Sequence, residues 1–282
     1  MDYIELNIPV AGDEQAEIIT AYLADFPFES FQHDGPMLKA YIPQHRMADC
    51  KADVDRLLAD NGIAGARYVS VETQNWNALW ESNFQPVDID GRIMIRAPFH
   101  AAPAAGVTDV VIMPRMSFGT GHHATTRLMS AAAADPQLAG LSGLDMGSGT
   151  GVLAIIAAMS GAAHVDAVDI DRWAYENCTE NIATNGVADR ITPLEGDAAL
   201  IEGRSYDFIF ANINRNILLA DMPRYVAALR AGGRLFMSGI LEADTDIIRS
   251  RAESLGLQYV ATKSYDGWAM VEFLNPHPAA VR

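Results

Sequence analysis

The stretch from Leu144 to Gly151, LDMGSGTG, constrains the fold of this chain more than any other. An apolar run ends in Asp145, and three glycines (Gly147, Gly149 and Gly151) then alternate with small polar residues. An apolar, helix-favouring segment follows (VLAIIAAM), and a second apolar run begins after it (VDAVD). The order strand, glycine turn, helix, strand is typical of the first half of a nucleotide-binding α/β fold, in which glycines let the backbone approach a ligand closely.

The spacing of the glycines indicates which nucleotide is bound. A dinucleotide fold has the pattern GxGxxG, and its third glycine would fall where this chain has Val152. The pattern present is GxGxG preceded by Asp145, which favours S-adenosylmethionine, a ligand without pyrophosphate whose amino group and sulfonium favour nearby carboxylates. Asp169, at the tip of the second strand, is placed to accept hydrogen bonds from two ribose hydroxyls. A turn that merely joins a strand to a helix is the alternative.

Composition limits the partners and the compartment. The chain has 20 basic and 36 acidic residues, a formal charge of −16, which argues against a broad nucleic-acid surface because such affinity comes largely from Lys and Arg. The charge suits a basic protein partner or simple solubility. Cys50 and Cys178 are isolated, which predicts a reducing compartment. With no signal-peptide pattern and no apolar run of about 20 residues, we expect a cytoplasmic protein without a membrane segment.

The first 72 residues are predicted to form a separate small domain. The expected elements are a strand at Tyr3–Pro9, a helix at Asp13–Asp25, strands at Glu29–Gln32 and Leu38–Ile42, a helix at Asp49–Asn61 and a strand at Arg67–Glu72. This βαββαβ order is that of a ferredoxin-like α+β domain, which by itself implies no chemistry. Residues 73–85, which include Trp76 and Trp80, are predicted to form a linker helix.

The remaining residues, 86–282, alternate strands and helices. Strands are expected at IMIRAPF, VTDVVIMP, ITPLEG, YDFIFAN, GRLFMSG, LQYVATKSY and WAMVEFL, and helices at Trp173–Asn185, Ile217–Leu229 and Asp244–Leu255. Such alternation predicts a mostly parallel sheet with helices on both faces. The closing pair of adjacent strands predicts that one strand runs antiparallel at an edge of the sheet.

A loop rich in Gly, Thr and His precedes the glycine turn. Its sequence, FGTGHHATT, lies within Pro114–Met129 and opens a helix, so backbone N–H groups and hydroxyls are available to a carboxylate at the helix N-terminus. Capping of the helix by Thr125 or Thr126 is a structural alternative that is compatible with this role. His122 and His123 have no third clustered ligand, so no metal site is predicted.

Two further polar residues follow predicted strands. Asp197, in the sequence EGD, is placed to reach an adenine amino group, with an exposed loop acid as the alternative. Asn212 ends FIFAN, at the carboxyl end of a buried strand where open α/β sheets bind ligands. Its amide oxygen can accept a hydrogen bond from an amine and aim the lone pair at a sulfonium methyl group. The alternative is a turn residue that caps the next helix, for which Asn214 and Asn216 also qualify.

The motifs FGTGHHATT, LDMGSGTG, DID, AN at a strand end and LFMSGIL together resemble the ribosomal protein L11 methyltransferases. The resemblance runs from about Trp80 to the C-terminus, and the N-terminal domain is similar in type. It implies a Rossmann-like class I methyltransferase domain with a seven-stranded sheet and S-adenosylmethionine as cofactor. The implied substrate is ribosomal protein L11, methylated on lysine ε-amines or its N-terminal α-amine and recognised by the N-terminal domain. We expect a monomer.

Carried over by motif, the family's cofactor contacts fall on Thr126, Gly147, Asp169 and Asn212. Gly149 and Asp197 complete the predicted cofactor site, and Asn212 is the catalytic candidate. The chain differs from the family directly after this asparagine, where Ile213-Asn214-Arg215 replaces the commoner Ile-Leu.

The resemblance implies in-line transfer of a methyl group to a neutral amine. A free lysine has a pKa near 10.4, so only about one in 10³ is neutral at pH 7.4 and ionisation adds roughly 4 kcal/mol to the barrier. A partly desolvated pocket lowers that pKa. Because no Glu or His stands out as a general base, Asn212 is expected to act by orientation.

Three other functions remain open. A methyltransferase acting on a glutamine or nucleobase nitrogen typically has Asn-Pro-Pro-aromatic at this strand end, and both prolines are absent here. A non-catalytic, ribosome-associated protein that binds the cofactor is the second, which the presence of both Asp169 and Asn212 disfavours. A nicotinamide dehydrogenase is the third, and Val152 argues against it.

Overall fold

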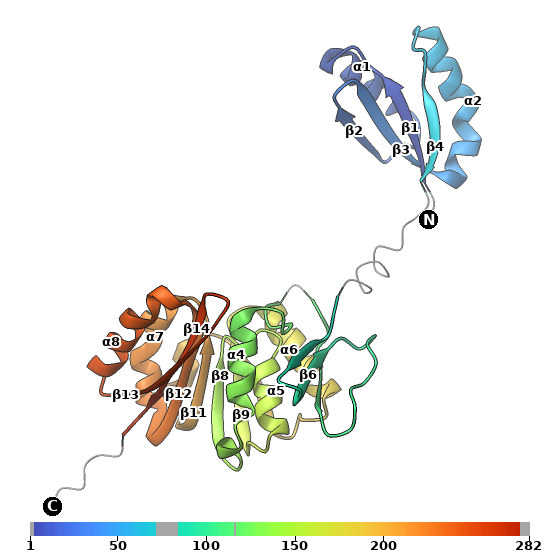
Figure 1. Ribbon diagram of the computed structural model, residues 1–282. Helices are drawn as coiled ribbons and strands as arrows, with labels where there is room; N and C mark the ends of the chain where they lie inside the picture. Colours follow the sequence, from blue (N-terminus) through green and yellow to red (C-terminus); the bar gives the residue numbers. More distant parts are fainter. Residues whose placement is uncertain (1–2, 72–83, 116, 277–282) are drawn as a thin grey trace, which may run out of the picture. The chain divides into compact units, whose positions relative to one another are not determined.

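The computed structural model of the protein describes residues 3–71, 84–115 and 117–276 (Figure 1). The chain divides into two compact units, Met1–Phe84 and Gln85–Arg282, and the division falls inside the predicted linker. Apart from its last two residues, the linker helix predicted for residues 73–85 lies outside the described residues.

The N-terminal unit is a four-stranded antiparallel sheet with two helices. Its elements are β1 (Tyr3–Pro9), α1 (Asp13–Leu23), β2 (Ser30–Asp34), β3 (Met37–Pro43), α2 (Gln44–Asp60) and β4 (Arg67–Val71). The strand order β2-β3-β1-β4 is that of the predicted ferredoxin-like fold. Helix α2 begins at Gln44 rather than Asp49, because its polar first turn precedes Met47 and Cys50, where its buried stripe starts. The core lies between the sheet and the helices and includes Leu6 and Val54.

A seven-stranded sheet forms the centre of the second unit (Figure 1). The strands are β8 (Ser142–Met146), β9 (His164–Asp169), β10 (Ile191–Glu195), β11 (Tyr206–Asn212), β12 (Leu229–Leu241), β13 (Gln258–Tyr265) and β14 (Trp268–Leu274). They are arranged in the order β10-β9-β8-β11-β12-β14-β13, and the first five are parallel. The predicted Rossmann-like architecture is therefore confirmed.

The antiparallel strand does not lie at the edge of the sheet, where the sequence analysis placed it. Strand β14 is antiparallel to β12 on one side and to β13 on the other, so β13 is the edge strand. Asp266 and Gly267 join the two strands with φ of 51° and 76°, as a two-residue hairpin turn requires. This turn determines that β13 pairs with β14, but it does not determine which of the two strands pairs with β12.

Helices cover both faces of the large sheet. They are α4 (Ala124–Ala133), α5 (Val152–Met159), α6 (Arg172–Thr184), α7 (Arg215–Ala228) and α8 (Thr245–Ser254), with short 3₁₀ helices η1 (Pro136–Leu138), η2 (Ala198–Ile201) and η3 (Glu242–Asp244). Helices α4, α5 and α6 share one core, which includes Ile155 and Cys178. Helices α7 and α8 share the other, which includes Leu218 and Ile248. Because the first seven residues of α5 are all buried, this helix needs its apolar sequence.

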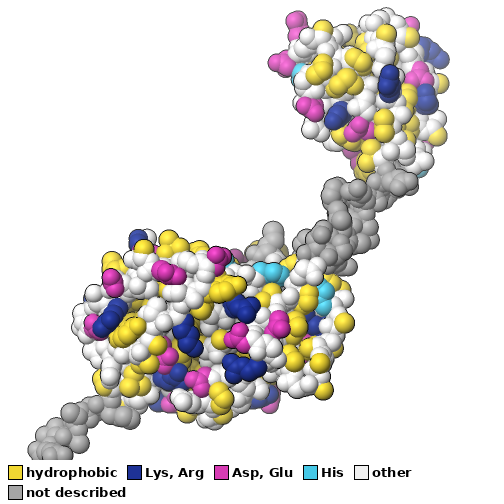
Figure 2. Space-filling model, in the orientation of Figure 1, with side chains coloured by type: hydrophobic (Ala, Val, Ile, Leu, Met, Phe, Trp, Pro, Cys, Tyr) yellow, Lys and Arg dark blue, Asp and Glu magenta, His cyan; other side chains and the backbone are white. Residues whose placement is uncertain are grey.

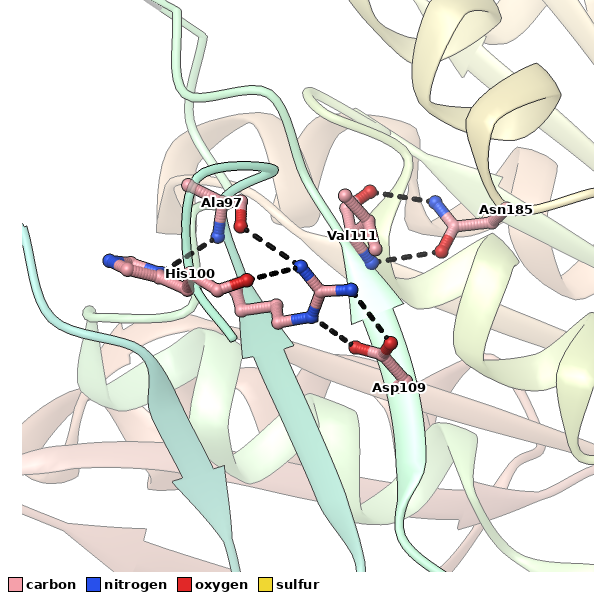
Figure 3. Close-up of polar contacts among 6 residues, drawn as sticks. Ala97, His100, Asp109, Val111 and Asn185 are labelled. Atoms are coloured by element: carbon pink, nitrogen blue, oxygen red, sulfur yellow. Dashed lines mark hydrogen bonds and ion pairs between the residues drawn. The ribbon is translucent and has the colours of Figure 1, made fainter. Parts of the chain in front are cut away.

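Three short strands before α4 form a sheet of their own. They are β5 (Val87–Ile89), β6 (Ile93–Arg96) and β7 (Thr108–Val111), paired in that order. Asp109 accepts hydrogen bonds of 2.7 and 2.9 Å from the Arg96 guanidinium (Figure 3). The side-chain amide of Asn185, which follows α6, bonds both the N–H and the carbonyl of Val111, at 2.9 and 2.7 Å (Figure 3). The first pair of contacts joins β6 to β7, and the second anchors the small sheet to the end of α6.

Charged side chains of both signs are interspersed on the face of the molecule shown in Figure 2. Within the described ranges, no helix is long and apolar enough to cross a membrane. Cys50 and Cys178 are free and buried, and burial raises the pKa of the Cys178 thiol to about 12. That thiol is therefore protonated and unreactive at neutral pH.

Candidate active site at the carboxyl ends of the parallel strands

The glycine turn after β8 has a backbone that only glycine adopts easily. Gly147, Gly149 and Gly151 have φ of +70°, +55° and +79°. A Cβ atom on Gly149 would lie 2.3 Å from the carbonyl oxygen of Phe118, and one on Gly147 would lie 2.3 Å from Cγ2 of Ile213. The turn is thus packed closely against the FGTGHHATT loop and the end of β11.

A cavity of about 660 Å³ opens at this edge of the sheet. It is lined by five of the six predicted site residues, namely Gly147, Gly149, Asp169, Asp197 and Asn212. They come from the segments that follow four parallel strands, and the fold brings them together because the carboxyl ends of these strands meet at one edge.

The sixth predicted residue, Thr126, does not line the cavity; its neighbour Thr125 does. The Thr126 side chain is buried in α4, and none of the described residues bonds its hydroxyl. His123, rather than either threonine, caps this helix, since its Nδ1 accepts a hydrogen bond from the Thr125 N–H at 3.3 Å. One step along a helix turns a side chain by about 100°, which is why the two threonines face different surroundings.

Asp169 is held at the end of β9 by two backbone hydrogen bonds. Its Oδ2 accepts the N–H of Gly149 at 2.8 Å, and its Oδ1 accepts the N–H of Asp171 at 3.0 Å. A carboxylate has about four acceptor sites, so each oxygen keeps one for a further donor such as a ribose hydroxyl. The side chain is half-buried and lines the cavity. It is therefore oriented before any ligand arrives.

Asp145, the first polar residue of the motif, lies beneath the turn. It is 1% exposed, and its Oδ2 accepts the N–H of Ala154 at 3.1 Å, whereas Oδ1 has no hydrogen-bond partner among the described residues. Burial raises the pKa of this carboxyl to about 7, the Ala154 hydrogen bond opposes the shift, and the charge of Asp169 adds to it. Asp145 is accordingly about half protonated at neutral pH.

Asn212 ends strand β11 and presents an unsatisfied acceptor at the cavity. Its Oδ1 is buried, and no described residue donates a hydrogen bond to it. Asn214 caps α7 instead, since its Oδ1 accepts the N–H of Ile217 at 3.1 Å. The capping role considered for Asn212 therefore belongs to Asn214.

Asp197 follows β10 and is exposed. Its Oδ1 accepts the N–H of Ala199 at 2.8 Å and so caps η2. The same side chain lines the cavity, so the loop position and the proposed contact with a ligand are compatible.

Several lining residues were missed by the sequence analysis. The rings of Phe118, His123 and Trp268 form edge-to-face contacts, with centroids 5.3 Å apart for Phe118–His123 and 4.6 Å apart for His123–Trp268. On α7, Asp221 and Tyr225 also line the cavity. The sequence pattern that could have pointed to these two residues is a carboxylate four residues before a tyrosine, both on one face of a predicted helix.

Within residues 3–71, 84–115 and 117–276, no group of three or more His, Cys, Asp or Glu side chains is arranged to hold a metal ion. The polar groups at the cavity include two acceptors, a carboxylate oriented by two backbone hydrogen bonds and a buried amide oxygen, and these fit the hydroxyls and amino groups of a nucleoside with an amino-acid tail.

The strand order, the glycine turn and the acid at the end of β9 define a class I methyltransferase domain that uses S-adenosylmethionine. The family model for ribosomal protein L11 methyltransferases matches residues 11–275, and the chain belongs to this family. The family resemblance predicted from the motifs is thus confirmed, and it extends into the N-terminal unit, where the motifs carried no signature.

Individual relatives agree with the family match. A ribosomal protein L11 methyltransferase of Porphyromonas gingivalis is 42% identical over 280 residues, covering 97% of this chain and 94% of the relative. One of Phocaeicola vulgatus is 39% identical, covering 97% of this chain and 99% of the relative. The crystal structure of a ribosomal protein L11 methylase from Lactobacillus delbrueckii subsp. bulgaricus has a TM-score of 0.63 and 24% identity, and the match covers 69% of this chain and all of that one. This last likeness shows the fold.

Proposed function

We propose that this protein transfers methyl groups from S-adenosylmethionine to amines of ribosomal protein L11, on lysine side chains, on the N-terminal α-amine or on both. The observation that carries the proposal is the 42% identity, over 97% of the chain, with a protein named as a ribosomal protein L11 methyltransferase. The cavity at the strand ends supports it, because its polar groups suit both a nucleoside and an amine.

The residues that hold the cofactor come from the turn and the strand ends. Asp169 accepts the two ribose hydroxyls with the oxygen lone pairs that Gly149 and Asp171 leave free. Gly147 and Gly149 let the backbone approach the ligand closely. Asp197 accepts the adenine amino group, and Thr125 replaces Thr126 as the residue of α4 nearest the site. When bound, S-adenosylmethionine supplies an electrophilic methyl group on a sulfonium.

Asn212 positions the accepting amine. Its buried Oδ1 accepts one N–H of the neutral amine, which fixes the direction of the nitrogen lone pair toward the methyl group. The apolar rings of Phe118 and Trp268 line the same cavity, and an amine bound against them loses part of its hydration, so the neutral form of the amine is favoured over the ammonium form. After transfer the nitrogen carries the new methyl group and releases a proton to water, which requires no dedicated base.

The N-terminal unit is proposed to recognise the substrate protein. It has its own hydrophobic core and lies largely within the region that the family model matches. The net charge of −16 suits a basic partner. We place the reaction in the cytoplasm and expect the protein to act as a monomer.

A labelling experiment tests the proposal. The protein is incubated with methyl-labelled S-adenosylmethionine and ribosomal components from cells that lack this methyltransferase, and the products are separated. The expected result is label in ribosomal protein L11. Label that ribonuclease removes would instead indicate a nucleobase methyltransferase, and cofactor binding without any label would indicate the non-catalytic alternative.

A further inference from the structure

Helix α7 presents one side of itself to the cavity. Ile217, Asp221 and Tyr225 are spaced four residues apart on this helix and all line the cavity. Tyr225 is fully buried, in the core that α7 shares with α8. Its phenolic oxygen is buried as well, and it has no hydrogen-bond partner in the part of the chain that the structure describes. A buried hydroxyl is normally bonded, so its position at a ligand cavity suggests that a ligand supplies the partner.

The hydroxyl is a donor at any pH at which the protein is used. Burial, and to a smaller extent the negative charge of Asp221, raise the pKa of Tyr225 far above its ordinary value of 10, while Arg224 opposes the shift. Tyr225 therefore keeps its proton, and its hydroxyl can donate a hydrogen bond to an acceptor of the ligand.

The position of Tyr225 indicates which end of the cofactor it meets. Helix α7 packs against η2, whose first residue Ala198 and cap Asp197 line the same cavity. The cap of α4, His123, lies at the start of a helix on the opposite face of the sheet. In a nucleoside the base is attached at C1′ and the 5′ substituent at C4′, so the two extend from opposite ends of the ribose ring. With the ribose on Asp169 and the amino-acid tail toward α4, the base extends toward η2 and α7.

We propose that Tyr225 is a specificity-determining residue for the cofactor base, and that its hydroxyl donates a hydrogen bond to a ring nitrogen of the adenine. The inference rests on the proposed function, since it takes S-adenosylmethionine as the cofactor. Asp197 accepts from the amino group of the base, and Tyr225 donates to a ring nitrogen. The two residues together recognise both kinds of polar group that adenine offers.

Binding of S-adenosylhomocysteine to the full-length protein tests this assignment without any turnover. Tyr225→Phe removes only the hydroxyl, and we expect it to weaken binding by about 3- to 10-fold in calorimetry, the worth of one neutral hydrogen bond. Adenine offers three ring nitrogens, so analogues in which carbon replaces one of them, 1-deaza, 3-deaza and 7-deaza, identify the acceptor. The analogue that lacks the accepting nitrogen should bind the wild-type protein more weakly than S-adenosylhomocysteine does, by the same factor. It should also bind the wild-type protein and Tyr225→Phe with equal affinity.

Tyr206→Phe is the matched control. Tyr206 is also a buried tyrosine of the same core, but its hydroxyl donates to Asp166 at 2.7 Å, and it does not line the cavity. Its substitution should leave the affinity for S-adenosylhomocysteine unchanged, and circular dichroism confirms the fold of both variants.

Two results would overturn the assignment. Equal affinity of wild type and Tyr225→Phe for S-adenosylhomocysteine would show that the hydroxyl does not contact the base. Equal weakening of all four ligands, S-adenosylhomocysteine and its three deaza analogues, by Tyr225→Phe would show a structural role only. Failure of the wild-type protein to bind S-adenosylhomocysteine at all is a distinct result, and it would refute the proposed function together with the inference.

Discussion

The buried carboxyl group of Asp145 should make the stability of the second unit depend on pH. Its pKa is raised from 3.8 to about 7 by burial in the folded protein. Between these two values the folded state holds one proton more than the unfolded state, so the free energy of unfolding falls by about 1.36 kcal/mol per pH unit. The stabilising contribution is complete below the unfolded pKa and is lost as the pH rises through 7. Between pH 5 and pH 8 the loss amounts to about 2.5 kcal/mol.

Asp145→Asn should remove this dependence. The amide keeps an oxygen to accept the Ala154 N–H, which lies 3.1 Å from Oδ2 in the native protein, but it has no proton to lose. Urea unfolding followed by circular dichroism at pH 5 and pH 8 gives the difference in free energy of unfolding between the variant and the native protein. Contributions of all other titrating groups cancel in that difference. We expect the free energy of unfolding of the variant, relative to that of the native protein, to rise by about 2.5 kcal/mol between pH 5 and pH 8. A difference that stays constant with pH would refute the protonation of Asp145 near neutrality.

Three further outcomes follow from the site and the two units. Asp169→Ala should weaken S-adenosylmethionine binding about tenfold or more in calorimetry while the protein stays folded, because two charge-assisted hydrogen bonds are lost at ~1.5–3 kcal/mol each. Unchanged affinity would show that Asp169 does not bind the cofactor. Gly149→Ala should lower the Tm and the cofactor affinity more than Gly186→Ala does. A Cβ atom at position 149 would lie 2.3 Å from a backbone carbonyl oxygen, whereas Gly186 has a similar φ (+67°) but open space around it. Equal losses in Tm would show that the close contact at Gly149 does not matter. A shortened protein that begins at Gln85 should bind the cofactor as the full chain does but methylate ribosomal protein L11 poorly, and equal turnover would exclude a recognition role for the N-terminal unit.

Much of the lining of the cavity could be predicted from the sequence because the residues concerned stand in contiguous motifs at strand ends. The LDMGSGTG segment contains both the apolar strand and the glycines of the turn, and Asp169 and Asn212 each end an apolar run. The carboxyl ends of parallel strands meet at one edge, so predicting the strands was enough to bring these residues together. The glycine conformations agree with this, since Gly147, Gly149 and Gly151 all have positive φ.

The rest of the site depends on packing that no local pattern specifies. Trp268 reaches the cavity only because β14 inserts between β12 and β13, a choice that the hairpin turn leaves open. Tyr225 is an aromatic residue on an apolar helix face, and the sequence cannot tell such a residue in a core from one whose hydroxyl faces a ligand. Thr125 rather than Thr126 lines the cavity because of the helical phase of α4, which begins after its cap His123. The strands β6 and β7 were predicted, but their pairing in a separate sheet was not.

The direct test of the account concerns Asn212 and uses Asn214 as its control. Single-turnover methylation of ribosomal protein L11 is measured beside thermal melts and S-adenosylhomocysteine binding for Asn212→Ala and Asn214→Ala. If the buried Oδ1 of Asn212 orients the amine, Asn212→Ala should slow methyl transfer by about 10²–10³, equivalent to ~2.7–4 kcal/mol, with far smaller changes in Tm and cofactor affinity. Asn214 also lines the cavity, but its Oδ1 is occupied by the Ile217 N–H, so Asn214→Ala should lose the α7 cap, about 1 kcal/mol of stability, and transfer at a nearly native rate. A native transfer rate in Asn212→Ala, with a lowered Tm, would contradict the account.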